Sequence, residues 1–307
     1  TGNIQFSSED ISEESLSHVV LFNDLRNELL RMCREKTIFS NEIQSIQNLN
    51  KESDPEVILK DGTSIKTKIV AGCDGRNSNV AKIVSLPNSY SKYEQTALTF
   101  IVDVKGADQT TAYQVFSERG IFALMPMPKK DSITNRYTVV WSIKNSELNN
   151  QDAMDYIKDN LSYFESKLKV SLALDSEILQ FGLSNHHFTN YISGPVVLIG
   201  DAAHSIHPLA GQGINIGLAD ADIFCEEIIK AYEKGISIND KAVLKKYEIR
   251  RKGMNLLMLK SMDFFVNTFN SENLYIRLLR NWGLKSVNKT MFIKAFFIKH
   301  ASGFNRI

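Results

Sequence analysis

A short apolar run constrains the fold more than any other feature of the sequence. Residues 195–200 read PVVLIG and contain no polar side chain. Such a run is typical of a strand that is buried on both faces of a parallel sheet. Ligands of open parallel sheets bind where the carboxyl ends of the strands lie. Asp201 follows the run directly, so a bound molecule is expected beside it, and its carboxylate can accept hydrogen bonds from sugar or sugar-alcohol hydroxyls.

The residues after this strand form a glycine-rich turn that leads into a predicted helix. Pro208 restricts the loop, and Gly211 and Gly213 allow the backbone to approach a flat ligand closely. The helix is expected over residues 213–234. Its first N–H groups have no helical acceptor, and its dipole favours partial negative charge at that end. The segment therefore predicts a site for the electron-rich edge of a flat, hydroxyl-bearing ligand.

A second turn of this kind follows another short strand. Residues 68–72 read KIVAG and predict a strand, after which Asp74 and Gly75 form a tight turn. Ser78 is expected to cap a short helix that runs through Val80. Taken alone, this motif is less specific than the first.

The remaining elements fall into blocks along the chain. Apolar spacing predicts helices over 22–36, 147–168 and 239–301, the last with a break near 270–272. Asp61 and Gly62 predict a hairpin turn. β-branched and aromatic residues between 95 and 143 predict an antiparallel sheet. The order α/β, antiparallel β, α/β and helices predicts a doubly wound domain into which an antiparallel-sheet domain is inserted, followed by C-terminal helices.

Composition argues against several functional classes. A formal net charge of +1 does not suit a nucleic-acid binder. No apolar run reaches the length of a membrane-spanning helix. The three cysteines are odd in number and widely spaced, which favours neither a disulfide framework nor a zinc site and suits a reducing, cytoplasmic compartment. His204 and His207 have no third ligand nearby, so no metal site is expected.

Charge is distributed unevenly along the chain. Residues 241–307 contain 14 Lys and Arg but three acidic residues, whereas residues 1–240 contain 22 basic and 32 acidic residues. This asymmetry suits a basic tail on an anionic membrane or an acidic partner, and equally a set of solvated helix faces.

The last part of the predicted C-terminal helix has an apolar arc. A helical projection of residues 291–300 places Phe292, Ile293, Phe296 and Phe297 on one arc, flanked by Lys294 and Lys299, as in helices that lie on a membrane surface. Burial of this arc in the protein or in an oligomer interface is the alternative.

The segment 207–220, HPLAGQGINIGLAD, resembles the signature of the ubiquinone-biosynthesis hydroxylases, which are FAD-dependent class A flavoprotein monooxygenases. Residues 69–80 resemble the Asp-Gly motif of the same superfamily. The resemblance implies FAD, NAD(P)H or another electron donor, and O2. It also implies hydroxylation of the ring of a polyprenylated phenol through a flavin C4a-hydroperoxide, at the periphery of the inner membrane or in a ubiquinone-biosynthesis complex. The cofactor carries this chemistry, so no catalytic side chain is assigned. The cofactor-binding residues implied are Asp201, Pro208, Gly211, Gln212, Gly213, Ile214, Asn215 and Asp74.

One expected motif is absent from these 307 residues. No Gly-x-Gly-x-x-Gly occurs, although in this family it opens the first βαβ unit, with an acidic residue about 20 positions later. We therefore expect the FAD-binding domain to be incomplete, and this chain alone to be inactive and not to retain FAD. The alternative is a non-catalytic remnant that acts as a membrane-associated assembly partner, which the intact second motif opposes. The expected boundaries are 1–88 and 180–238 for the FAD-binding domain, 89–179 for the substrate domain and 239–307 for the helical region.

Overall fold

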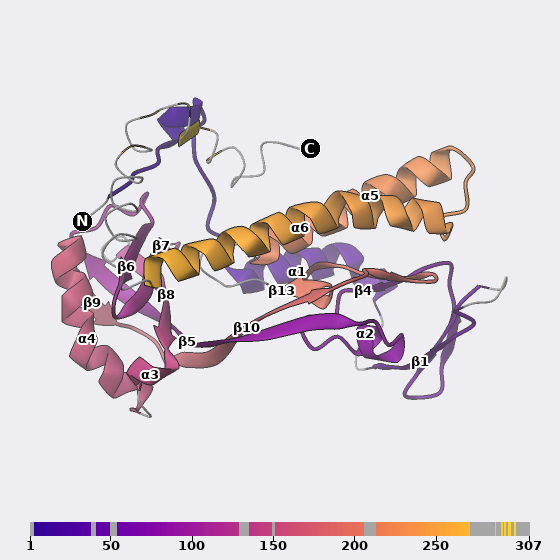
Figure 1. Cartoon of the computed structure of the whole chain (residues 1–307), viewed down its shortest axis with the longest axis horizontal. Helices are drawn as coiled ribbons and strands as arrows, with labels where there is room; N and C mark the ends of the chain where they lie inside the picture. The colour runs from indigo at the N-terminus through magenta and orange to yellow at the C-terminus, as the bar shows by residue number, and fades with distance from the viewer. Residues whose placement is uncertain are drawn as a thin grey trace. The chain divides into compact units, whose positions relative to one another are not determined.

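The computed structural model describes most of the chain, which divides into two compact units (Figure 1). Unit 1 comprises Thr1–Met32, Thr96–Phe181 and Phe264–Ile307, and unit 2 comprises Cys33–Gln95 and Gly182–Asp263. The described residues are 3–37, 41–49, 54–128, 135–148, 151–205 and 213–270, with Ser286, Thr290, Phe292, Lys294, Ala295 and Ile298.

A small sheet in unit 2 contains the apolar run. Its strands lie in the order β11 (Ile192–Ser193), β12 (Val196–Leu198) and β4 (Val70–Gly72). β12 pairs in parallel with β4, and all three of its residues are fully buried. The prediction of a buried parallel strand is therefore confirmed. Tyr247 packs in the same core, and its hydroxyl donates to the carbonyl oxygen of Leu198 at 2.8 Å.

The predicted hairpin lies in a second sheet of unit 2, of order β1 (Ile43–Gln47), β2 (Glu56–Leu59) and β3 (Ser64–Lys66). Gly62 in its turn has a φ of +87°, which suits glycine, and the prediction is confirmed.

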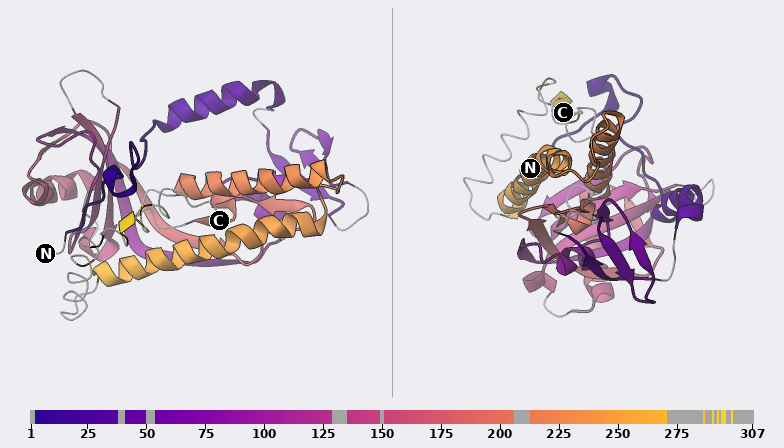
Figure 2. Two further views of the ribbon diagram at one scale, coloured as in Figure 1. Left: turned by 90° about the horizontal axis from the view of Figure 1, so that it is seen from above. Right: turned by 90° about the vertical axis from the view of Figure 1, so that its right-hand side faces the viewer.

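Two long helices of unit 2 run side by side, as the two views of Figure 2 show. They are α5 (Gly213–Glu233) and α6 (Lys241–Asn270). The last part of α6, residues 264–270, belongs to unit 1. Arg250 of α6 forms ion pairs with Glu226 and Glu227 of α5, which tie the helices together. The predicted break after 270 lies outside the described residues. Within the described part of the chain, no helix is both long and apolar enough to cross a bilayer.

Unit 1 is built on antiparallel strands, as predicted. The larger sheet has the order β13 (His204–Ser205), β10 (Leu179–Phe188), β5 (Asn88–Lys105), β8 (Asn135–Lys144), β7 (Gly120–Pro126) and β6 (Tyr113–Ser117), with β9 (Ser171–Leu174) on β5. β5 and β10 each contribute residues to both units, and β13 belongs to unit 2. The core of unit 1 centres on Trp141, with Phe122 stacked on Phe164 at 4.2 Å between ring centroids. This combination of α/β and antiparallel β structure confirms the predicted fold class.

Two of the predicted helices have different ends in the structure. The helix expected over 22–36 is α1 (Phe22–Cys33), followed by a 3-10 turn, η2 (Arg34–Lys36). The helix expected over 147–168 is split into α3 (Asn145–Leu148) and α4 (Ala153–Leu168). The split occurs because Asp152 caps α4, accepting the N–H of Met154 at 2.8 Å. The short elements are η1 (Ser8–Ile11), α2 (Asn79–Ile83) and η3 (Gly200–Ala202).

Candidate functional site

The two sequence motifs lie at one edge of the small sheet in unit 2. β4 and β12 are parallel neighbours, and Gly72 is in register with Leu198. The N–H of Ile199 donates to the carbonyl oxygen of Gly72 at 3.0 Å, which continues the pairing. Asp74 and Asp201 follow these strand ends, and both residues are exposed. Two acidic turns therefore share the carboxyl edge, where ligands of such sheets bind.

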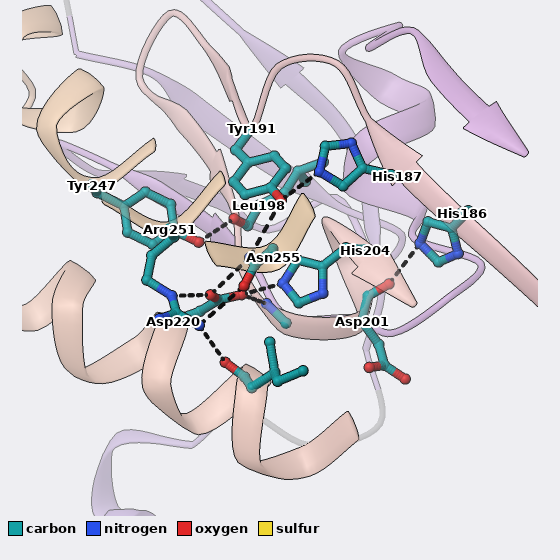
Figure 3. A network of polar contacts seen from close by, with 12 residues as sticks. His186, His187, Tyr191, Leu198, Asp201, His204, Asp220, Tyr247, Arg251 and Asn255 are labelled. Carbon is teal, nitrogen blue, oxygen red and sulfur yellow. Dashed lines mark hydrogen bonds and ion pairs between the residues drawn. The ribbon is translucent and has the colours of Figure 1, made fainter. Parts of the chain in front are cut away.

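The turn that holds Asp201 is built by η3. Gly200 begins it with a φ of +61°, a left-handed conformation that side chains disfavour. The main-chain carbonyl of Asp201 accepts a hydrogen bond from Nε2 of His186 at 2.9 Å. Its carboxylate has no partner in the described part of the chain and points away from the buried polar groups (Figure 3). The side chain is thus free to accept hydrogen bonds from a ligand.

The second turn of α5 lies against this turn. A Cβ atom on Gly200 would be 3.3 Å from Cα of Gly217, so the two backbones almost touch. Gly213, Ile214 and Asn215 form the start of the same helix, one turn before Gly217. Ile214 is 53% exposed and Asn215 is also exposed. The helix start offers N–H donors and the positive end of a dipole.

Asp74 has a defined partner in the structure. Its Oδ2 accepts the N–H groups of Asn79 at 2.6 Å and Val80 at 3.0 Å, at the start of α2. Ser78 Oγ accepts the N–H of Ala81 at 2.9 Å, so the predicted Ser78 cap is confirmed. The Asp74 carboxylate therefore fixes its own turn onto α2. Its contact with a cofactor stays a prediction.

Behind the edge lies a buried polar network centred on Asp220 of α5 (Figure 3). Asp220 is fully buried and pairs with Nε of Arg251 at 2.6 Å. Burial alone would raise the pKa of Asp220, but hydrogen bonds from His204 and Arg251 more than offset it and lower the pKa below its usual value. Because the carboxylate is ionised, Nε2 of His204 is the donor in their 2.5 Å contact. Asn255 links Asp220 to the hydroxyl of Tyr191 at 3.3 Å.

Comparison with known proteins identifies the family. Residues 17–260 match the family described as FAD binding domain. The chain belongs to this family. The match covers both units and includes the two acidic turns and the Asp220 network.

Curated relatives of this FAD-binding chain carry names from ubiquinone biosynthesis. The 3-demethoxyubiquinol 3-hydroxylase of Escherichia coli K12 is 30% identical over 81% of the chain. The ubiquinone biosynthesis monooxygenase COQ6 of Dictyostelium discoideum is 28% identical over 98% of the chain. The chain spans 62% of the length of the first relative and 67% of the second.

Solved structures of flavoprotein monooxygenases share the fold. p-Nitrophenol 4-monooxygenase PnpA of Pseudomonas putida superposes with a TM-score of 0.71 at 15% identity, covering 91% of this chain and 72% of that one. P. aeruginosa PqsL in complex with 2-aminobenzoylacetate gives 0.70 at 18% identity, covering 85% and 71%. At such identities the likeness concerns the fold alone.

The structure brings together some of the residues predicted to bind FAD. Asp201 lies in the turn that contacts α5 at Gly217, and Asp74 follows the neighbouring strand. Gly213, Ile214 and Asn215 begin the same helix, and the contact of all these residues with FAD stays a prediction. His204 is paired with Asp220, and the described residues contain no cluster of metal-binding side chains. The other predicted residues, Pro208, Gly211 and Gln212, lie outside the described residues, as does His207.

Sequence reasoning missed the residues behind the site. Asp220 is noticed only as the last residue of the signature, and Arg251 and Asn255 lie in the basic C-terminal region, for which no site residue was predicted. His186 and Tyr191 belong to no motif. A weak signal existed for Asp220, because an acidic residue within a largely apolar helix face requires buried partners.

His187 gives the FAD-binding domain a predictable pH dependence. Burial, followed by nearby positive groups, lowers the pKa of His187 to about 4. The hydroxyl of Tyr191 therefore donates to the neutral ring at Nε2, at 3.0 Å. An unfolded histidine titrates near pH ~6.5, so between about pH 4 and 6.5 the unfolded chain holds a proton that the folded chain lacks. Stability should fall as the pH decreases through this window.

The variant His187→Gln tests this, because glutamine keeps an acceptor for Tyr191 and does not titrate. Urea unfolding of both proteins at several pH values between about 4 and 7 should show a flatter dependence for the variant. Burial also lowers the pKa of His186, which is present in both proteins and leaves the comparison intact. Equal slopes would contradict the assignment to His187.

Proposed function

We propose that the protein is an FAD-dependent monooxygenase that hydroxylates the aromatic ring of a polyprenylated phenol in ubiquinone biosynthesis. The observation that carries the proposal is the free Asp201 carboxylate in a turn packed against α5, at the carboxyl ends of two parallel strands, in a chain of the FAD-binding family. Two relatives with ubiquinone-pathway names support the substrate class. NAD(P)H or another donor supplies the electrons.

The residues at the edge suit a flavin in their donor and acceptor chemistry. The Asp201 carboxylate can accept hydrogen bonds from the ribityl hydroxyls. The N–H groups at Gly213, Ile214 and Asn215 can face the pyrimidine edge, where a reduced flavin is negative. The close contact of Gly200 with Gly217 packs the Asp201 turn against α5, the helix that begins with these three residues. When bound, FAD supplies the activation of O2, and the chain orients the ring and excludes water.

Association with an anionic membrane is a further part of the proposal. The structure bears on two of the residues that were expected to contact the membrane, Phe292 and Lys294. Phe292 is 82% exposed, as expected for a lipid-facing side chain. Lys294, however, forms an ion pair with Asp10 at 2.6 Å, and its side chain is only 12% exposed. The expectation that Lys294 flanks the arc toward lipid is therefore wrong.

Membrane association is tested by co-sedimentation with anionic vesicles at low and high salt. The variant changes Lys285, Lys289 and Lys299 to Gln and leaves Lys294 intact. Equal binding by wild type and variant to anionic vesicles at low salt would exclude this basic anchor.

Activity is tested with the purified protein that includes residues 1–307, FAD, NAD(P)H, labelled O2 and a ubiquinone-pathway phenol. We expect one labelled oxygen atom in the ring of the product and the other in water, with one NAD(P)H oxidised for each product formed. A parallel reaction replaces NAD(P)H with a reduced electron-transfer protein, to test whether another donor supplies the electrons. FAD binding without product from any phenol tested would favour the non-catalytic assembly role.

A further inference from the structure

Asp220 uses its two carboxylate oxygens for different partners. Oδ2 accepts the N–H of Gly200 at 3.0 Å and Nε2–H of His204 at 2.5 Å. Oδ1 accepts Nε–H of Arg251 at 2.6 Å and Nδ2–H of Asn255 at 3.2 Å, both from α6. One oxygen therefore holds the strand end, and the other holds a helix.

The two donors on Oδ2 lie on either side of Asp201 in the chain. Between them, the N–H of Ala203 donates to the carbonyl oxygen of Gly200 at 2.8 Å, and His186 holds the carbonyl of Asp201. The turn cannot move relative to α5 without breaking a bond to a fully buried carboxylate. Leaving such a group without its partners costs more than the bonds themselves contribute.

We propose that Asp220 is a positioning residue that fixes the Asp201 turn against α5, so that the turn and the start of the helix meet the same ligand. This inference rests on the proposed FAD site. Asp220 itself is fully buried and acts through the turn. Arg251 balances its charge, so the turn is held without a net negative charge behind an edge that favours an anionic ligand.

If Asp220 had only a structural role, loss of a donor to either of its oxygens would have the same effect on FAD binding. Removing a donor to Oδ1, which faces α6, would then weaken FAD binding as much as removing a donor to Oδ2, which faces the turn. Positioning predicts a difference between them, because only Oδ2 contacts the segment that carries Asp201. His204 and Asn255 offer a matched pair for this comparison, since each donates one side-chain N–H to Asp220 and each is 2% exposed.

The experiment compares His204→Leu, which removes the turn-side donor, with Asn255→Leu, which removes the α6-side donor. His204→Gln restores an N–H donor. Three measurements are made on the protein that includes residues 1–307: FAD titration, circular dichroism of the bound flavin, and hydrogen exchange of the 200–204 backbone without flavin. Thermal unfolding of each variant monitors general stability.

We expect His204→Leu to weaken FAD binding about tenfold, because a turn that is no longer fixed would lose most of the one charge-assisted hydrogen bond expected between Asp201 and the flavin. It should also alter the flavin dichroism and speed exchange at 200–204. Asn255→Leu should lower the melting temperature but have a smaller effect on FAD affinity, flavin dichroism and exchange at 200–204. His204→Gln should recover the affinity for FAD. Equal losses in the two leucine variants, or wild-type affinity in His204→Leu, would overturn the inference.

The outcome separates the inference from the proposed function. If wild type binds no FAD, the proposed function fails for this polypeptide, and the exchange data alone decide the inference. Unchanged exchange at 200–204 in His204→Leu would then reject positioning by Asp220, whereas faster exchange confined to this segment would support it.

Discussion

In the full-length protein that includes residues 1–307, replacing Asp201 with alanine should raise the dissociation constant for FAD by about 10- to 150-fold. The carboxylate is free and exposed at the edge, so its expected contribution is one charge-assisted hydrogen bond, about 1.5–3 kcal/mol. The fold should be unaffected, because no described residue donates to this carboxylate. Flavin fluorescence quenching during titration measures the change.

Asp222→Ala is the matched control, since Asp222 is an exposed acid on α5 away from the edge. It should bind FAD as wild type does. Asp201→Asn should lose less affinity than Asp201→Ala, because the amide retains one acceptor oxygen. Wild-type affinity in Asp201→Ala would remove this residue from the site.

Replacing Asp220 with alanine should lower the free energy of unfolding by about 3–5 kcal/mol. The substitution leaves the Arg251 guanidinium, Nε2–H of His204 and the N–H of Gly200 without their buried acceptor. Urea unfolding measures the loss. The control is Glu226→Ala, which removes a half-exposed acid that pairs with Lys230 and Arg250, and which should cost less than about 1 kcal/mol. Similar losses in the two variants would mean that the network contributes little.

The contribution of Asp220 should also depend on pH with a defined sign. Its pKa is lower in the folded protein than in the unfolded chain. The stabilisation is therefore complete above the unfolded value, about 3.9, and is lost as the pH falls through the lower folded pKa. In Asp220→Asn this acid-side loss should be absent.

Local patterns were sufficient to predict much of unit 2. An apolar run identified β12, two turn residues identified the hairpin, and a serine identified the cap of α2. Each signal arises within a few residues, from burial, turn geometry or capping. The carboxyl edge could also be predicted, because parallel strands place their ends together.

Contacts between distant segments could not be predicted in this way. The Asp220 network joins β13, α5 and α6, and no local spacing shows that Arg251 reaches Asp220. Lys294 illustrates the same limit: the helical projection gave its direction on a helix, whereas its partner Asp10 lies near the other end of the sequence. The split before α4 was missed because a cap competes with apolar periodicity over the same residues.

The two glycines in the contact between the Asp201 turn and α5, Gly200 and Gly217, differ in how well they would tolerate a side chain. Gly200 combines a left-handed φ with a Cβ position 3.3 Å from the opposing backbone, whereas a Cβ on Gly217 would meet Cα of Gly200 at an ordinary 3.4 Å. A library randomised at both positions should therefore return glycine at 200 whichever flavin analogue is used for selection, and admit alanine at 217. Attempts to evolve a new cofactor preference on this scaffold should keep the strand end fixed and vary the helix side.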